Sequence, residues 1–229
     1  MTLEIIYRDE HLIAINKPHG LLVHRSNIAR DATRFAIQEL RNQVEQHVHP
    51  VHRLDRKTSG VLLFALDKDT LRDLQSLFRD RLVEKNYHAI VRGFLPEEGV
   101  IDYALKTDRG VQQAVTRYES VQHFEIPIPS ARPPTQRYSL CNVLPQTGRQ
   151  HQIRRHFKHI FHPIIGDRPY GCNKQNRFWK ETFSLHDMML HARSLNFSWK
   201  DRQIKIEAKP SSEFRRVLNI LQNHKISSE

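Results

Sequence analysis

The feature that most constrains the fold is an apolar run at residues 61–66, which directly follows the turn-forming triplet Thr58-Ser59-Gly60. A run of this length and branching predicts a fully buried β-strand. The triplet favours a turn, so Asp55 is expected on a loop that enters the core. With Arg53 and Arg56 close in sequence, the charged form of this carboxyl group would be favoured, which suits a nucleophile or a base. An ordinary loop salt bridge explains the same residues equally well.

Length and charge limit the class of protein. The 229 residues are enough for one large domain or two small ones, each with a real core. The formal net charge is +11 and the pI is near 9.9. Such an excess of positive charge indicates a polyanionic partner, because binding releases counterions, but it does not separate RNA from DNA.

The cysteine count and the hydropathy indicate a cytoplasmic protein. Cys141 and Cys172 are too few for a disulfide framework and fit a reducing cytosol. The first ten residues carry too many charges for a signal peptide. No apolar run approaches the ~20 residues that cross a bilayer, so no membrane partner is expected.

Periodicity predicts alternating strands and helices along the chain. Residues 3–7 and 12–16 are expected to form a strand pair, and residues 31–47 a helix that Asp31 caps. Leu71, Leu74, Leu77, Phe78 and Leu82 form the apolar stripe of a second helix. The alternation in 84–93 predicts a strand with one buried face, and residues 138–145 a further strand. Near the C-terminus, residues 203–207 are expected to be a strand, followed by a helix after Ser211.

Two segments carry basic residues that could bind phosphates. Residues 95–137 look irregular, and four prolines between 122 and 136 indicate an extended excursion that presents Arg132 and Arg137. An inert surface loop remains the alternative. A turn at Thr147-Gly148 leads into a predicted helix whose first half is strongly basic, which costs helix-dipole energy unless an anion lies nearby.

Three motifs resemble those of a known family. Residues 52–60, His52-Arg53-Leu54-Asp55-Arg56-Lys57-Thr58-Ser59-Gly60, resemble the signature of the RluA-type pseudouridine synthases, with seven fixed residues in nine positions. Residues 14–24 resemble the family's first motif, and residues 147–156 resemble its third. Segments at 137–138, 154–156, 175–177 and 189–192 are similar to one branch, the tRNA pseudouridine-65 synthases.

The resemblance implies roles for individual residues. Asp55 would be the catalytic nucleophile, Tyr87 of Lys85-Asn86-Tyr87 would pack on the target base and is a candidate proton acceptor, and Arg154 would pair with the catalytic Asp. Arg53 would help to fill the stack vacated by a flipped base. The residues expected to bind RNA are Arg53, Arg56, Lys57, Arg132, Arg137, Arg149, His151 and Arg155.

The resemblance also implies the fold and the reaction. It implies an α+β fold, a single pseudouridine synthase catalytic domain over residues 1–229, with a mixed, largely antiparallel sheet and flanking helices. Because the first strand begins at residue 3, no S4-type RNA-binding domain is expected before it. The substrate would be a tRNA uridine at position 65, isomerised to pseudouridine without cofactor or metal.

The sequence leaves alternative functions open. A ribosomal RNA substrate would keep the chemistry, whereas a catalytically silent RNA-binding module would not need Asp55, Tyr87 and Arg154. A glycosidic hydrolase would ordinarily use two carboxylates, and only Asp55 lies in a strong motif. A zinc site would need three or four converging ligands. The histidines that suggest zinc are His49, His52, His151, His156, His159 and His162.

Overall fold

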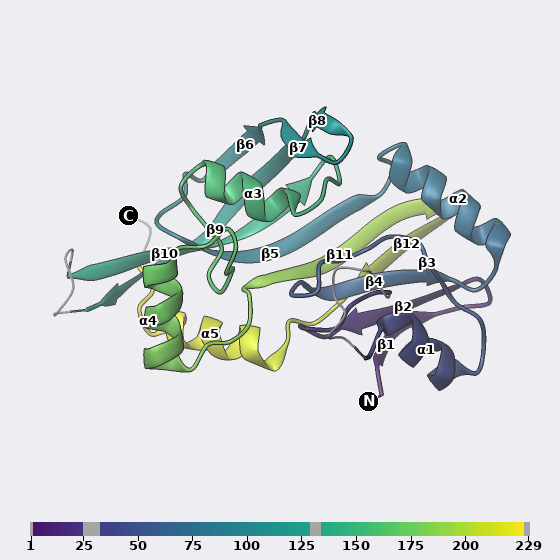
Figure 1. Cartoon of the computed structure of the whole chain (residues 1–229), viewed down its shortest axis with the longest axis horizontal. Helices are drawn as coiled ribbons and strands as arrows, with labels where there is room; N and C mark the ends of the chain where they lie inside the picture. Colours follow the sequence, from purple (N-terminus) through teal and green to yellow (C-terminus); the bar gives the residue numbers. More distant parts are fainter. Residues whose placement is uncertain (1, 25–32, 129–133, 227–229) are drawn as a thin grey trace. The chain divides into compact units, whose positions relative to one another are not determined.

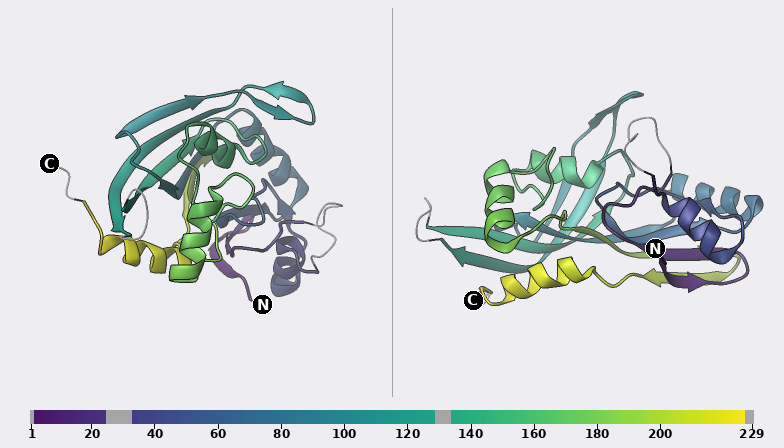
Figure 2. Two further views of the ribbon diagram at one scale, coloured as in Figure 1. Left: turned by 60° about the vertical axis from the view of Figure 1, so that its left-hand side comes forward. Right: turned by 60° about the horizontal axis from the view of Figure 1, so that its bottom comes forward.

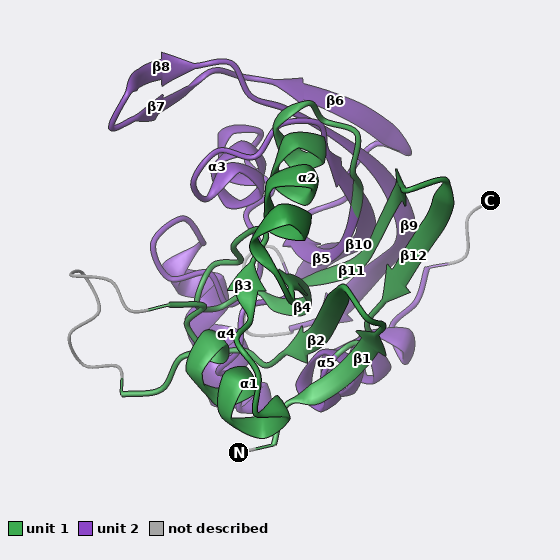
Figure 3. Ribbon diagram, turned by 90° about the vertical axis from the view of Figure 1, so that its right-hand side faces the viewer, with its two compact units in different colours: residues 1–85, 191–210 green, residues 86–190, 211–229 purple. Residues whose placement is uncertain are grey.

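The apolar run after the turn triplet forms β4 (Ser59–Ala65), and every residue of this strand is buried. The computed structural model describes residues 2–24, 33–128 and 134–226. The chain divides into two compact units, residues 1–85 with 191–210 and residues 86–190 with 211–229 (Figure 3). Asp31 and Arg132 lie outside the described residues.

The first unit is built on β4. The predicted strand pair forms as β1 (Glu4–Arg8) and β2 (Leu12–Lys17), and β2 pairs antiparallel with β4. On its other side β4 runs parallel to β11 (Leu190–Trp199), which pairs with β12 (Arg202–Glu207). The short β3 (His49–Pro50) also pairs with β4. A parallel pair inside an otherwise antiparallel arrangement gives a mixed sheet, as predicted.

Two helices complete the first unit (Figure 1). α1 (Ala36–Val44) begins after Phe35, which provides no side-chain cap, so the helix is shorter than the predicted 31–47. α2 (Lys68–Arg79) is capped by Asp67, whose carboxylate accepts a 2.8 Å hydrogen bond from the Thr70 amide. Leu82 does not belong to the apolar stripe, because the helix ends before it and the residue is 63% exposed.

The second unit carries an antiparallel sheet in the order β5 (Glu84–Arg92), β10 (Thr135–Pro145), β9 (Val115–Pro127) and β6 (Glu98–Asp102). A separate hairpin consists of β7 (Leu105–Thr107) and β8 (Gly110–Gln112). The helices are α3 (Gln152–His159), α4 (Asn173–Phe183) and α5 (Ser212–Gln222), which Figure 2 shows from two sides. Both units are α+β, which confirms the predicted class.

Two predictions for the second unit were wrong. Residues 95–137 are not irregular but contain most of a long hairpin, in which β9 buries Thr116 and Tyr118 and exposes Arg117 between them. Pro127 lies at the end of β9 and interrupts no internal pair. β5 also buries both of its faces, since residues 89–91 lie in one core with Phe157 of α3 and Phe214 of α5.

Candidate active site

Asp55 lies on the loop between β3 and β4 in the first unit. Its carbonyl oxygen accepts a 3.1 Å hydrogen bond from the Thr58 amide, which closes a turn. Leu54, just before it, is only 6% exposed and fastens the loop to the core. The Asp55 side chain is half-buried. The turn therefore holds a carboxylate at the edge of the core, as the sequence predicted.

Lys17 is a fully buried cation next to this loop. It is 0% exposed, and its ammonium group donates to the carbonyl oxygens of Pro18 at 2.9 Å, Leu21 at 2.8 Å and Arg56 at 3.2 Å. Burial lowers the pKa of Lys17 to about 7, while the nearby Asp55 carboxylate acts to raise it. The site thus places a titratable positive charge near the candidate nucleophile.

The same contacts tie two motifs together. The Gly20 amide donates to the Arg56 carbonyl at 2.8 Å, and the Arg56 Nε donates to the Gly20 carbonyl at 3.1 Å. Gly20 has a φ of +84°, a conformation that glycine adopts without cost. Residues 17–21 are therefore hydrogen-bonded to the Asp55 loop through Arg56. Both the backbone and the side chain of Arg56 take part.

Contacts with the neighbouring strand β11 explain why Ser59 and Gly60 stand in the turn triplet. An added Cβ at Gly60 would lie 2.1 Å from the Ala192 carbonyl oxygen, and Gly60 has a φ of +108°. Ser59 Oγ lies 2.9 Å from His191 Nδ1, and His191 Nε2 lies 3.1 Å from the Ala208 carbonyl. Because a carbonyl only accepts, Nε2 carries the proton and Nδ1 accepts from Ser59. The triplet locks the start of β4 onto β11.

His52, the first residue of the signature, has a structural role. Burial lowers the pKa of His52 to about 4, so the ring is neutral at pH 7. Its Nε2 accepts a 3.2 Å hydrogen bond from the Leu63 amide, and the ring stacks on Phe78 at 4.9 Å. A protonated ring could not accept this bond, so the contact requires the neutral form.

In the second unit, Arg154 and Asp167 form a buried ion pair. Arg154 Nε and Nη2 donate to the two carboxylate oxygens at 2.7 and 2.9 Å, and the side chains are 6% and 1% exposed. Tyr170 covers the guanidinium, with its ring centre 5.0 Å from Cζ, and its hydroxyl group lies 3.0 Å from His151 Nδ1. This bidentate pair fixes the direction of the Arg154 side chain. Tyr87 is half-buried against the core of the same unit.

The remaining basic residues divide into held and exposed groups. Arg149 Nε donates to the Gln113 carbonyl at 3.1 Å, and Arg155 Nη1 donates to the Lys106 carbonyl at 2.9 Å. Arg137 stacks on the Phe94 ring at 4.8 Å and donates to Glu125 at 3.2 Å. Arg53 is exposed, and Lys57 is half-buried.

The histidines that suggested zinc are used within the fold. His156 contacts Thr116 Oγ1 at 2.9 Å and the Tyr103 carbonyl at 3.0 Å, and His162 contacts the Arg92 carbonyl at 2.8 Å. His159 stacks on Tyr103 with ring centres 3.6 Å apart. Among the described residues, no group of three His, Cys, Asp or Glu side chains converges as metal ligands would.

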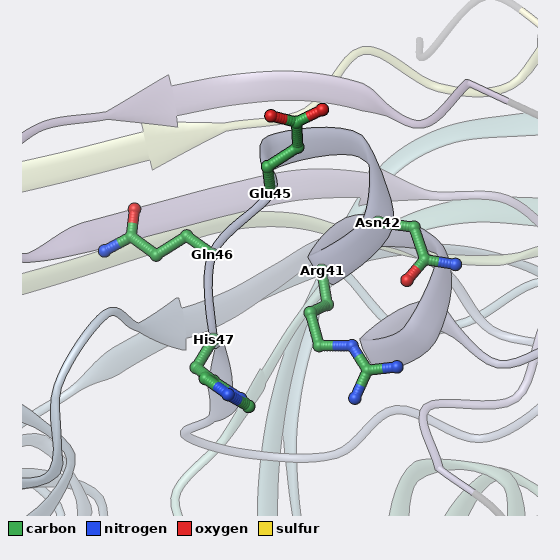
Figure 4. A pocket seen from close by; sticks show the side chains of 5 residues that line it. All are labelled: Arg41, Asn42, Glu45, Gln46 and His47. Carbon is green, nitrogen blue, oxygen red and sulfur yellow. The ribbon is translucent and has the colours of Figure 1, made fainter.

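A surface recess lies elsewhere in the first unit, at the end of α1. It is lined by Arg41, Asn42, Glu45, Gln46 and His47, shown in Figure 4. Glu45 ends the helix in a left-handed conformation with a φ of 54°. None of the predicted site residues lines this recess. Of the helices that the structure describes, none is both long and apolar enough to span a bilayer.

Comparison with known proteins decides the family. The model of a family described as RNA pseudouridylate synthase matches residues 11–159, which include Lys17, Asp55, Tyr87 and Arg154. The chain belongs to this family. It is an RNA pseudouridine synthase, and therefore an isomerase.

Curated relatives and a solved structure extend the match over nearly the whole chain. A protein of Haemophilus ducreyi named tRNA pseudouridine synthase C is 50% identical over 209 residues, covering 86% of each chain. One of the same name from Pasteurella multocida is 47% identical over 234 residues and covers 96% of each chain. The structure of Human RNA Pseudouridylate Synthase Domain Containing 4 is 28% identical, with a TM-score of 0.75, and covers 96% of this chain and 93% of that one.

For this pseudouridine synthase, sequence reasoning missed one residue that lies beside the Asp55 loop. The sequence places Lys17 in the first motif, at the break after the predicted strand, and predicts no site role for it. The available signal was a lysine between a buried strand and a proline-glycine turn. Its three carbonyl acceptors come partly from a loop almost 40 positions away, so the spacing could not reveal them.

Proposed function

We propose that this enzyme isomerises a uridine of tRNA, at position 65, to pseudouridine, and that residues 1–229 serve this activity as one catalytic domain. The observation that carries the proposal is the 43–50% identity to curated relatives named tRNA pseudouridine synthase C over most of the chain. The basic composition agrees with a polyanionic substrate. Intact Asp55, Tyr87 and Arg154 in their motifs argue against a silent RNA-binding module.

The proposed reaction needs only groups that the chain itself carries. The target base leaves the stack and enters the site, and Arg53 fills the space left behind. Asp55 attacks the nucleoside or removes a sugar proton, and the bond between the sugar and nitrogen 1 breaks. The uracil turns and carbon 5 bonds to the sugar, and in this step the bond between Asp55 and the nucleoside breaks or the sugar proton returns from Asp55. The proton on carbon 5 is then released to solvent. Nitrogen 1 gains a proton, so the product is an isomer of the substrate.

The Lys17 contacts support Asp55 in this role. The Lys17 ammonium group lies close enough to Asp55 for the two charges to attract each other, which helps to position the carboxylate that would act as the nucleophile. The backbone hydrogen bonds among residues 17–21 and 55–56 limit how far the loop can move, so that little ordering remains to be done when the substrate binds. Tyr87 and Arg154 complete the proposed catalytic set, with Asp167 fixing the direction of Arg154.

The test compares Asp55→Asn with the wild type on tRNA labelled with tritium at carbon 5. Tritium release should be abolished, while tRNA affinity stays within about tenfold, or roughly 1.4 kcal/mol. Activity of the Asn variant within tenfold of the wild type would remove Asp55 from the chemistry.

The substrate is tested separately, by mapping pseudouridine in total RNA from cells with and without the protein. Loss of the modification at tRNA position 65 is the expected result. Loss at a ribosomal RNA position instead would keep the chemistry and overturn the proposed substrate.

A further inference from the structure

The β7–β8 hairpin is held by the helix on which the sequence predicted phosphate-binding residues. We call residues 103–114 the arm. Its two strands have three residues each and pair only with one another. The hairpin is labelled β7 and β8 in Figure 1 and Figure 3. An isolated two-stranded hairpin is marginally stable at best in water. The position of the arm must therefore depend on contacts at its base.

Those contacts come from α3 and the turn before it. Arg155 Nη1 donates to the Lys106 carbonyl of β7 at 2.9 Å, and Arg149 Nε donates to the carbonyl of Gln113, the residue after β8, at 3.1 Å. The two guanidinium groups therefore hold both sides of the arm. His156 contacts the Tyr103 carbonyl at 3.0 Å. Apolar anchoring is limited to the base, where Leu105 and Ala114 are buried.

Two positively charged side chains of the arm face solvent. Lys106 and Arg109 are exposed, and in the described part of the chain no hydrogen bond or ion pair engages either side-chain cation. Thr107 Oγ1 fixes the turn between them by donating to the Gly110 carbonyl at 3.0 Å and accepting from the Arg109 amide at 3.1 Å. Asp108 is the only acidic residue of the arm. An ordered arm thus presents two cations that the fold does not use.

We infer that Arg149 and Arg155 are positioning residues, which hold the arm so that Lys106 and Arg109 contact RNA phosphates, and that they are not themselves phosphate ligands. The inference rests on the proposed RNA substrate. The same helix carries Arg154, so the arm and a proposed catalytic residue share one support. The arginines at the start of α3 donate to protein acceptors, Arg155 to the Lys106 carbonyl and Arg154 to the Asp167 carboxylate, and the negative charge of Asp167 offsets part of the positive charge there.

The experiment measures two properties of Arg155→Ala. Amide hydrogen exchange of residues 105–112 in the free protein should become at least about tenfold faster, because the arm loses a fastening bond. Lys158→Ala is the matched control, since this residue is exposed on the same helix and, among the described residues, makes no hydrogen bond or ion pair with the arm. It should leave that exchange unchanged.

The second readout is tRNA affinity in a double-mutant cycle. Lys106→Gln with Arg109→Gln should lower the salt slope by roughly two units, because two phosphate contacts are lost. Arg155→Ala should weaken binding in the wild-type background and add no further loss when those two charges are absent. Turnover at saturating tRNA should stay within about twofold, since the change affects binding rather than the reacting groups.

Three results would overturn the inference. Unchanged exchange of the arm in Arg155→Ala would show that the residue does not hold it. An equal loss of affinity in both backgrounds would identify Arg155 as a phosphate ligand in its own right. A wild-type protein that binds no tRNA would refute both this inference and the proposed function, whereas faster arm exchange, which needs no RNA, would still establish the positioning contact.

Discussion

The Asp55 loop and the arm use the same kind of contact in opposite surroundings. Beside the loop, the fully buried Lys17 at the end of β2 donates to three backbone carbonyls. At the arm, Arg149 and Arg155 donate to backbone carbonyls at the surface. Water can replace a donor that is lost at the surface, but not one that is lost in the core. Burial, rather than the number of hydrogen bonds, therefore decides which of these contacts the fold requires.

Two glycines with positive φ give the sharpest test. Gly60, where β4 begins, has no room for a methyl group, since its Cβ would lie 2.1 Å from a backbone oxygen. Gly110, in the turn of the arm, has a φ of +89° and nothing within 4 Å of an added Cβ. Gly60→Ala should therefore cost more than about 4 kcal/mol or prevent folding, whereas Gly110→Ala should cost only the left-handed strain of about 1 kcal/mol.

Urea unfolding of both variants measures the difference. The contrast between the loop and the arm would be lost if Gly60→Ala unfolded within 1 kcal/mol of Gly110→Ala. The Gly110 variant also serves as the control for the backbone effect, because both glycines have left-handed conformations and only one is crowded.

Neighbouring arginines on α3 provide the next comparison. Arg154→Ala would leave Asp167 as an unpaired buried carboxylate, which costs about 3–5 kcal/mol. Arg155→Ala exposes only a carbonyl that water can reach, so the unfolding free energy should change by less than about 1 kcal/mol. The free energies come from the same urea titrations.

The folded fraction decides how the Arg154 result is interpreted. Activity of Arg154→Ala must be compared at a temperature at which the variant is folded, since loss of stability alone would mimic a catalytic defect. Arg154→Lys keeps the charge and loses the bidentate geometry. Normal stability and normal turnover in that variant would show that the two parallel hydrogen bonds to Asp167 are not needed.

The part of the site that the sequence predicted well is local. The buried strand after the turn triplet, the Asp55 turn and the start of the helix after Ser211 depend on neighbours a few positions away. Lys17 and the arm were missed because their partners are distant in sequence: Arg56 for Lys17, and the 103–114 segment for α3. The prolines between residues 122 and 136 also led to the wrong prediction of an irregular segment. A strand can end at a proline and still be regular before it, as β9 does at Pro127.

Lys17→Met tests the buried side of the comparison directly. The change removes the donor of three carbonyls and should lower the unfolding free energy by about 2–4 kcal/mol at pH 7. The pKa of Lys17 is about 7 in the folded protein, against an ordinary 10.5 for lysine. Between these values the unfolded chain binds more protons, so this lysine makes the wild type more stable as pH rises. The Met variant should lack that part of the pH dependence.

His52 supplies a control at acidic pH. Its pKa is about 4 in the folded protein against an ordinary 6.5, so its contribution to stability is present above pH 6.5 and is lost as pH falls towards 4. Lys17→Met should leave this loss of stability between pH 6.5 and 4 unchanged. A variant whose stability changed in its pH dependence both below pH 6.5 and above pH 7 would indicate a general rearrangement of the loop rather than the loss of one cation.

Arg137 is expected to show the smallest effect on stability. It is exposed, it pairs with Glu125 at 3.2 Å, and it stacks on Phe94 at 4.8 Å. Solvent screens the pair, and a cation–π contact at the surface contributes about 0.5–1 kcal/mol, so Arg137→Ala should change the unfolding free energy by less than about 1 kcal/mol. If the side chain also reaches a phosphate, the salt slope of tRNA binding should fall by roughly one unit. An unchanged slope with normal affinity would leave Arg137 as a surface contact of β10, and the RNA-facing charge would then have to lie elsewhere.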